Sequence, residues 1–189
     1  PASISEQSRD RTSGDSNEGE EHVKTKLYLD VDGVILRRTG QLTPRGSTEF
    51  KVANGAATFL RWCIGHFDCI WLTARSRDSN ISEVERAFRH AVWNPITSAQ
   101  ERAELMACVS LIPVASWGAT KAEGIAVEEH FFWVDDDPDE ASLEWLERRG
   151  LRNRLVVAST DQSHDDLVRV QGILADCLWG KSVTVRESP

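Results

Sequence analysis

Two aspartates one residue apart, Asp30 and Asp32, follow a short apolar run in "KLYLDVDGVIL" (residues 26–36). The apolar run predicts a buried strand over 26–31 that ends at these acids. Two carboxylates at such a short spacing repel each other, and burial makes the repulsion more costly. A divalent cation removes that cost, so the pair indicates a metal site.

Two later segments end in side chains of matching chemistry. "FDCIWLTAR" predicts a second buried strand that reaches Thr73, and "HFFWVDDDPDE" predicts a strand that runs into Asp135 and Asp136. Lys121 lies between them in the sequence and is the only lysine from residue 52 to residue 180. In open parallel sheets ligands bind beyond the carboxyl ends of the strands, so these groups are expected to meet at one edge.

Four carboxylates beside a lysine and a hydroxyl suit a phosphate group next to a hard cation. Carboxylate oxygens and water are the ligands that Mg²⁺ prefers. The cation and the lysine would neutralise the charge on the phosphate, while the hydroxyl and backbone amides bind its oxygens. These residues therefore predict a Mg²⁺ site that acts on a phosphorylated substrate.

The order of these motifs resembles that of the haloacid dehalogenase (HAD) superfamily of phosphohydrolases. It runs Asp-x-Asp-Gly, a strand ending in Thr, a Lys, and a strand ending in Asp-Asp, and it covers about residues 26–160. "LYLDVDGVI" is the most specific part of the match. The resemblance implies a hydrolase with a HAD-like α/β fold: a doubly wound, Rossmann-like, mainly parallel sheet with helices on both faces.

The same resemblance implies a role for each residue. Asp30 is expected to be the nucleophile that forms an aspartyl-phosphate, and Asp32 the acid/base that protonates the leaving oxygen and then activates water. The residues expected to bind the phosphoryl group and substrate are Gly33, Thr73, Ala74, Arg75 and Lys121. The expected Mg²⁺ ligands are Asp30, the main-chain carbonyl of Asp32, Asp135 and Asp136, the last directly or through water.

Apolar strand-like segments alternate with helix-like segments along the chain, which predicts a parallel sheet covered by helices. Residues 34–51 contain Gly40, Pro44 and Gly46 and predict a turn-rich flap or hairpin. Helices are predicted over 54–66, 79–93, 98–107, 119–129, from an N-cap at Asp137 to Arg149, and 164–179, and strands over 67–75, 108–116 and 154–158.

The 189 residues are expected to form one domain. Residues 1–23 are polar and predict a disordered tail, residues 24–181 the catalytic domain, and residues 182–189 a short C-terminal tail. The intervals between the motifs are too short for a large cap domain. The site is therefore expected to be open and to suit a bulky substrate such as a phosphoprotein or a nucleic-acid end.

A formal net charge of −8 argues against broad electrostatic binding to nucleic acid, although it leaves room for a local site. Arg37, Arg38 and Arg45 lie close together in the sequence and suit contact with a phosphate group, but exposed arginines are more often solubilising charge. No signal peptide or membrane-spanning run is visible, and the four cysteines lack the spacing of a zinc site. These features favour a cytoplasmic protein without membrane contact.

Three other functions stay open from sequence alone. A phospho-receiver domain uses the same residue types, but its acid pair comes first along the chain, whereas an Asp-Asp pair comes last here. A catalytically weak HAD-like module could bind phosphorylated ligands or partners through the same residues. A nucleic-acid end-processing phosphatase is suggested by a looser resemblance of "WLTAR", "WVDDD" and "STDQSHDDLVRVQGIL" to HAD-type domains of bacterial RNA-repair proteins.

Overall fold

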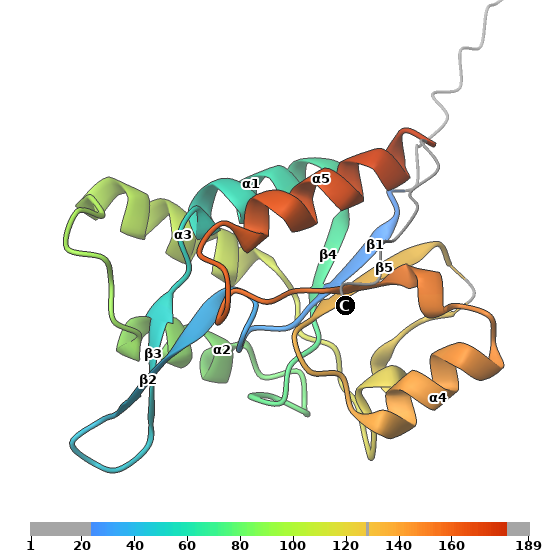
Figure 1. Cartoon of the computed structure of the whole chain (residues 1–189), viewed down its shortest axis with the longest axis horizontal. Coiled ribbons are helices and arrows are strands. Elements are labelled where there is room, and N and C mark those ends of the chain that lie inside the picture. The colour runs from blue at the N-terminus through green and yellow to red at the C-terminus, as the bar shows by residue number, and fades with distance from the viewer. Residues whose placement is uncertain (1–23, 128, 181–189) are drawn as a thin grey trace, which may run out of the picture.

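A computed structural model describes residues 24–127 and 129–180, and the tails predicted at 1–23 and 182–189 lie outside the described residues. A four-stranded parallel sheet with the strand order β4–β1–β5–β6 forms the centre (Figure 1). The strands are β1 (Lys26–Leu29), β4 (Asp68–Trp71), β5 (Phe131–Asp135) and β6 (Leu155–Val157). The predicted α/β class with a mainly parallel sheet is therefore confirmed.

The central strands are buried on both faces, which explains their nearly continuous apolar sequences. Successive side chains point to opposite faces, so Leu27 and Leu29 of β1 pack in one hydrophobic cluster and Tyr28 in another. The same alternation on β5 sends Phe132 to the first cluster and Trp133 to the second. Each face of the sheet therefore needs its own cover.

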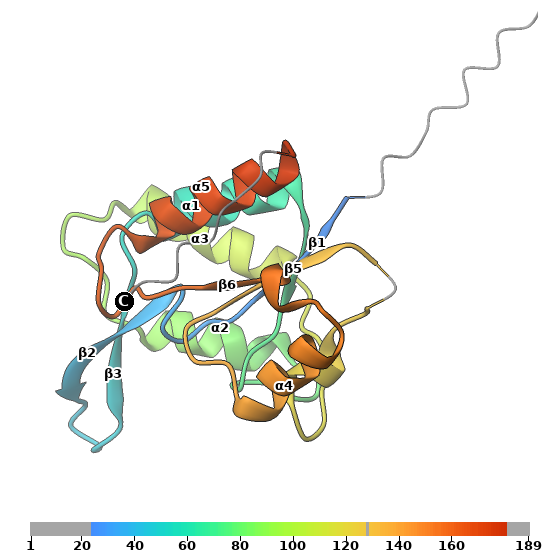
Figure 2. The same cartoon turned by 45° about the vertical axis from the view of Figure 1, so that its right-hand side comes forward.

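Helices supply that cover on both faces (Figures 1 and 2). The α-helices of the described residues are α1 (Ala56–His66), α2 (Ile81–His90), α3 (Ala99–Leu111), α4 (Glu140–Arg148) and α5 (Asp166–Leu178). α1, α2, α3 and α5 contribute to the cluster that contains Leu27, whereas α4 packs on the Tyr28 side through Leu146. The arrangement is consistent with a Rossmann-like fold. None of these helices combines the length and the apolar character that crossing a bilayer requires.

The strand predicted over 108–116 is wrong. α3 continues to Leu111, and Val114 alone joins the sheet, through a single parallel bridge to Trp71 at its β4 edge. The apolar run "CVSLI" satisfies a buried helix as well as a strand, and Val109 is buried as part of the helix. Pro113 then ends any further helix.

The helix predicted over 119–129 is also wrong. The chain makes one 3₁₀ turn there, η1 (Lys121–Gly124), and Ile125 is already extended. Gly124 lies so close to the chain before it that a Cβ would be 3.2 Å from the carbonyl oxygen of Ser116. Glycine also disfavours helix, so the turn does not propagate. A second 3₁₀ turn, η2 (Arg152–Arg154), precedes β6.

The N-cap predicted at Asp137 lies two residues too early. Asp139 caps α4, because its Oδ1 accepts a hydrogen bond from the backbone N–H of Ser142 at 2.8 Å. The N–H of Asp137 instead donates to Oδ1 of Asp135 at 3.0 Å. The extra turn between β5 and α4 therefore supplies a backbone hydrogen bond to the Asp135 carboxylate at the end of β5.

Between β1 and α1 the chain forms an antiparallel hairpin that projects from the sheet, as Figure 1 shows. Its strands are β2 (Leu36–Leu42) and β3 (Thr48–Val52), so the hairpin predicted within 34–51 is confirmed. The base is anchored where the N–H of Val52 donates to the carbonyl of Val92 at 3.0 Å. Among the described residues this hairpin is the whole insertion between the first strand and the first helix.

Candidate metal and phosphate site

β1 and β5 are neighbours in the sheet, and both run into aspartates at the same edge. Asp30 follows β1, and its N–H donates to the carbonyl of Val134 at 2.9 Å, so it extends the register of the sheet. Asp135 ends β5, and Asp136 follows it. One carboxylate oxygen from each of Asp30, Asp135 and Asp136 lies within 4.8 Å of the other two. The structure thus brings together the three aspartates whose carboxylates were predicted to hold metal, while the main-chain carbonyl predicted for Asp32 stays a prediction.

Lys121 belongs to the same cluster. Its Nζ donates to Oδ2 of Asp30 and to Oδ2 of Asp135, both at 2.7 Å, and the residue is only 8% exposed. The turn that carries it is fixed where the N–H of Ala122 donates to the Ser142 hydroxyl of α4 at 3.2 Å. One lysine therefore holds acids from two strands.

Burial and like charge dominate the electrostatics of this cluster. Burial raises the pKa of Asp30, and Lys121 opposes that rise. Burial, together with the charge of Asp30, raises the pKa of Asp135 to about 7. Burial acts to lower the pKa of Lys121, but the two carboxylates outweigh it and the net shift is upward. A single lysine does not fully offset the two acids.

Asp136 packs against Gly33, the glycine of the Asp-x-Asp-Gly motif. A Cβ at residue 33 would lie 1.9 Å from Oδ2 of Asp136, and the φ angle of Gly33 is +71°, which favours glycine. The Thr160 hydroxyl donates to the Gly33 carbonyl at 2.6 Å and holds the turn in place. The motif therefore needs glycine to admit the carboxylate of Asp136.

Sequence analysis missed Arg38 of β2 as a site residue. Its Nη1 donates to Oδ2 of Asp136 at 2.8 Å and to Oδ2 of Asp161 at 2.7 Å. The hydrogen bond to Asp136 raises the pKa of Arg38 above its usual range, so the guanidinium stays charged. In the sequence Arg38 is one of a group of arginines, and nothing local singles it out. Its contacts with Asp136 and Asp161 depend on the angle at which the hairpin leaves the sheet.

Asp32 stands apart from the three clustered acids. Its Oδ1 accepts hydrogen bonds from Nε and Nη2 of Arg75, at 2.9 and 2.7 Å. The Asp32 side chain is 23% exposed, against 7% for Asp30, so it lies toward solvent. The Arg75 guanidinium also lies over the ring of Phe50 on β3, 4.7 Å from the ring centroid. The hairpin therefore supports this side of the edge as well.

Thr73 is fully buried just beyond β4. Burial raises the pKa of Asp30, and a hydrogen bond with the Thr73 side chain offsets part of that rise. The Thr73 hydroxyl therefore lies against the Asp30 carboxylate. The hydroxyl also accepts a hydrogen bond from the N–H of Arg75 at 3.3 Å, and the Thr73 carbonyl accepts one from Nε1 of Trp117 at 3.2 Å. Ala74 is exposed in the turn that follows.

The donor set and its charge fit a divalent cation. The three clustered carboxylates offer the oxygen ligands that a hard cation prefers, and Asp30, Asp135 and Asp136 are the residues that would hold it. The clustered acids and the residues joined to this edge by ion pairs carry a formal net charge of −2, which one divalent ion would neutralise. That charge is the balance of five acids against three bases: Asp30, Asp32, Asp135, Asp136 and Asp161 against Lys121, Arg38 and Arg75.

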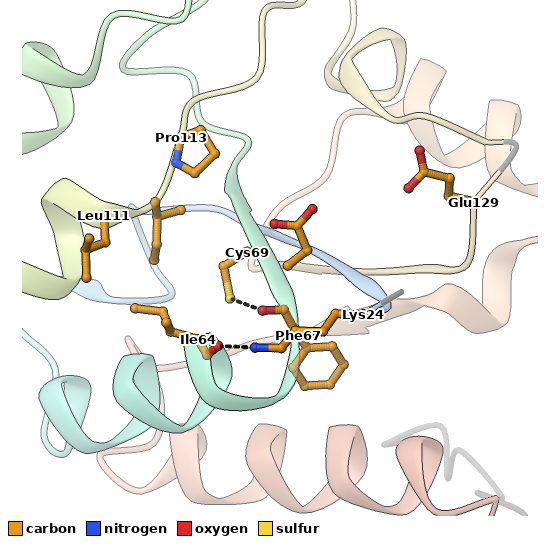
Figure 3. A pocket seen from close by; sticks show the side chains of 9 residues that line it. Lys24, Ile64, Phe67, Cys69, Leu111, Pro113 and Glu129 are labelled. Atoms are coloured by element: carbon orange, nitrogen blue, oxygen red, sulfur yellow. Dashed lines mark hydrogen bonds between the residues drawn. The ribbon is translucent and has the colours of Figure 1, made fainter. Parts of the chain in front are cut away.

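Two cavities of the described chain lie outside this cluster. One, of about 360 Å³, lies at the opposite end of the sheet, where Lys24, Phe67 and Cys69 are among its lining residues (Figure 3). The other, of about 290 Å³, lies between the start of α1 and the segment that carries Trp93. Neither is lined by a residue predicted to be catalytic.

No protein-family model matches the sequence, and no curated protein matches it. Comparison with solved structures finds a hypothetical protein from Xanthomonas campestris that is 15% identical in sequence. The alignment covers 85% of this chain and 90% of that chain, with a TM-score of 0.37. Because this likeness is weak, a function has to be inferred from the residues of the site.

Proposed function

We propose that the protein is a Mg²⁺-dependent phosphohydrolase that cleaves a phosphate monoester through an aspartyl-phosphate on Asp30. The convergence of Asp30, Asp135 and Asp136 around Lys121 at the carboxyl edge of a parallel sheet carries this proposal. Buried ionised groups contribute little to stability even when they are paired. A cluster with more acids than bases is therefore better explained by ligand binding than by folding.

The residues divide between holding the cation and binding the phosphoryl group. Bound Mg²⁺ would supply electrostatic stabilisation of the charge that develops on the transferring phosphoryl group. Lys121 adds positive charge beside Asp30 and favours its ionised, nucleophilic form. Thr73 and Arg75 follow β4, whereas the acids that would hold the cation end or follow β5, and these two strands flank β1. We assign the Thr73 hydroxyl and the Arg75 guanidinium to the phosphoryl oxygens.

The proposed reaction has two balanced steps. A carboxylate oxygen of Asp30 attacks phosphorus, the bond from phosphorus to the leaving oxygen breaks, and Asp32 gives that oxygen a proton. Asp32 then takes a proton from water, whose oxygen attacks phosphorus to release inorganic phosphate and restore Asp30. Arg75 occupies Oδ1 of Asp32, while Oδ2 has no hydrogen bond to any residue that the structure describes, so Oδ2 is the oxygen through which Asp32 would act on the leaving oxygen and on water.

The substrate is a phosphorylated molecule that an open edge can admit. A hairpin, and no larger insertion, stands beside the site in the described chain, which suits a bulky substrate such as a phosphoprotein or a nucleic-acid end. The net charge of −8 does not favour nucleic acid.

Hydrolysis of para-nitrophenyl phosphate, with Mg²⁺ and with EDTA, tests this function. We expect activity that requires Mg²⁺ and that Asp30→Asn lowers by about three orders of magnitude or more. Asp68→Asn is the matched control, because Asp68 is an exposed aspartate at the opposite end of the sheet. Activity that persists in Asp30→Asn contradicts the mechanism. A wild-type protein that binds phosphate without turnover favours the binding module instead.

A further inference from the structure

Arg38 links three parts of the chain that are far apart in sequence. Its guanidinium contacts Asp136 beyond β5 and Asp161 in the loop between β6 and α5. The backbone N–H of Arg38 also donates to Oδ1 of Asp161 at 2.6 Å. Asp161 thus fixes both the main chain and the side chain of Arg38, and the guanidinium has a defined position when it meets Asp136.

These contacts use one oxygen of Asp136 and leave the other available. Oδ2 accepts the hydrogen bond from Arg38 and packs against Gly33, whereas Oδ1 has no hydrogen bond to any residue in the described part of the chain. Both oxygens of Asp30 and both of Asp135 already accept hydrogen bonds. In the cluster, Oδ1 of Asp136 is therefore the oxygen that is oriented and still unused.

We propose that Arg38 and Asp161 are positioning residues for the metal site. Asp161 holds Arg38, and Arg38 holds Asp136 by one oxygen so that the other is left for the cation. This inference rests on the proposed function, because it takes the three clustered acids as the cation site. Outer partners of ligating carboxylates commonly have this role, and their loss lowers metal affinity about 10–100-fold. The hairpin then becomes part of the metal site as well as a wall beside the substrate.

Charge alone predicts the opposite effect at Arg38. A guanidinium next to a cation site repels the incoming ion, so removing it should tighten cation binding if electrostatics decided the matter. If Arg38 orients Asp136, removing it should weaken binding. The sign of the change in affinity therefore distinguishes the two roles.

The experiment titrates the metal-free protein with Mn²⁺ in the absence of substrate. The electron paramagnetic resonance signal of free Mn²⁺ measures how much of the ion stays unbound. We expect Arg38→Gln and Asp161→Asn each to weaken binding about 10–100-fold. The matched controls are Arg45→Gln, an exposed arginine on the same hairpin, and Asp165→Asn, an exposed aspartate in the same loop as Asp161. Both controls should stay within about twofold of wild type, because neither side chain has a hydrogen bond to Asp136 or to Arg38 among the described residues, and their more distant charges are screened by salt.

Arg38→Lys completes the set, because lysine keeps the charge but has a shorter side chain, so its ammonium does not occupy the position of Nη1, from which Arg38 donates to both carboxylates. We expect it to recover only part of the affinity. Binding by Arg38→Gln that equals or exceeds that of wild type overturns the proposal, as does full affinity in Arg38→Lys. A wild-type protein that binds no Mn²⁺ contradicts the proposed function itself, and so separates that failure from a failure of the role assigned to Arg38.

Discussion

The two ends of the central sheet hold charged residues in different ways. At the carboxyl end Asp30, Asp135 and Lys121 are buried and pair across strands. At the amino end Lys26 pairs with Glu129 at 3.2 Å, with 46% of the Glu129 side chain exposed. Yet the amino end, and not the carboxyl end, has the cavity of about 360 Å³. Buried charge, more than empty volume, marks the candidate site in this molecule.

The same kind of contact therefore has a different meaning at each end. An ion pair in solvent contributes little to the free energy of folding, either favourably or unfavourably. The pair of Lys26 with Glu129 therefore needs no functional explanation. Buried ions lose hydration that their mutual attraction repays only with good geometry and further hydrogen bonds. The pairs of Lys121 carry that cost, and the cation that we propose for this site would explain why they persist.

We expect the largest difference between variants of two lysines, one at each end of the central sheet. Lys121→Met leaves two buried carboxylates without their cation, and we expect it to lower the free energy of unfolding by about 3–5 kcal/mol in EDTA at pH 8. Lys26→Met removes a partly exposed pair and should cost less than about 1 kcal/mol. Urea unfolding of both variants measures the difference. Equal losses in the two variants would remove the distinction between the ends.

The next comparison uses two glycines. At Gly33 a Cβ would clash with Asp136 and the φ angle is positive, so Gly33→Ala should destabilise the protein by about 1–3 kcal/mol and weaken Mn²⁺ binding. At Gly65, near the end of α1, no atom lies within 4 Å of a Cβ, so Gly65→Ala should stabilise by about 0.5–1 kcal/mol. Thermal unfolding should show shifts of opposite sign. A Gly33→Ala protein as stable as wild type would mean that Asp136 does not pack there.

The smallest expected effect is a pH dependence confined to the carboxyl end. The pKa of Asp135 is raised to about 7, so at pH 6 a cation must displace a proton that is already gone at pH 8. We expect Mg²⁺ affinity about tenfold higher at pH 8 than at pH 6, seen as a larger Mg²⁺-induced rise in Tm. In the metal-free protein the same raised pKa makes stability fall as pH rises from about 4 towards 7, because the folded state keeps a proton that the unfolded state has lost.

Variants from the two ends sharpen that test. Asp135→Asn should lower Mg²⁺ affinity at both pH values, because a ligand is lost, and should also reduce the difference between pH 6 and pH 8, because the carboxyl whose pKa is about 7 is gone. Lys26→Met should keep the difference, because its side chain lies at the other end of the sheet. A Mg²⁺ effect on Tm that is the same at both pH values in the wild type would contradict the role of Asp135.

The ends of the strands were largely predictable from sequence. Apolar runs stop where polar residues begin, and in a parallel sheet the carboxyl ends share one edge, which puts Asp30, Thr73 and Asp135 near each other. The position of Lys121 could be expected only as a member of that edge, since the helix predicted around it is a single 3₁₀ turn. Its contacts with two acids follow from tertiary packing and not from local propensity.

What sequence could not predict depends on the angle and length of connecting segments. Arg38 reaches Asp136 because the hairpin leaves β1 at a particular angle and Asp161 holds it there, and no local pattern encodes that angle. Asp32 belongs to the same motif as Asp30, yet pairs with Arg75 from the next strand end, because β1 ends at Leu29 and the chain bends at Val31, so Asp32 no longer follows the alternation of the strand. Short apolar runs such as "CVSLI" also fit a buried helix and a buried strand equally well.

Crystals grown with Mn²⁺ and beryllium trifluoride, a mimic of a phosphoryl group on a carboxylate, test the central claim most directly. We expect an anomalous Mn²⁺ peak among Asp30, Asp135 and Asp136 and a trifluoroberyllate attached to Asp30. A peak at the amino end of the sheet, or none among these three acids with Asp30 unmodified, would contradict it.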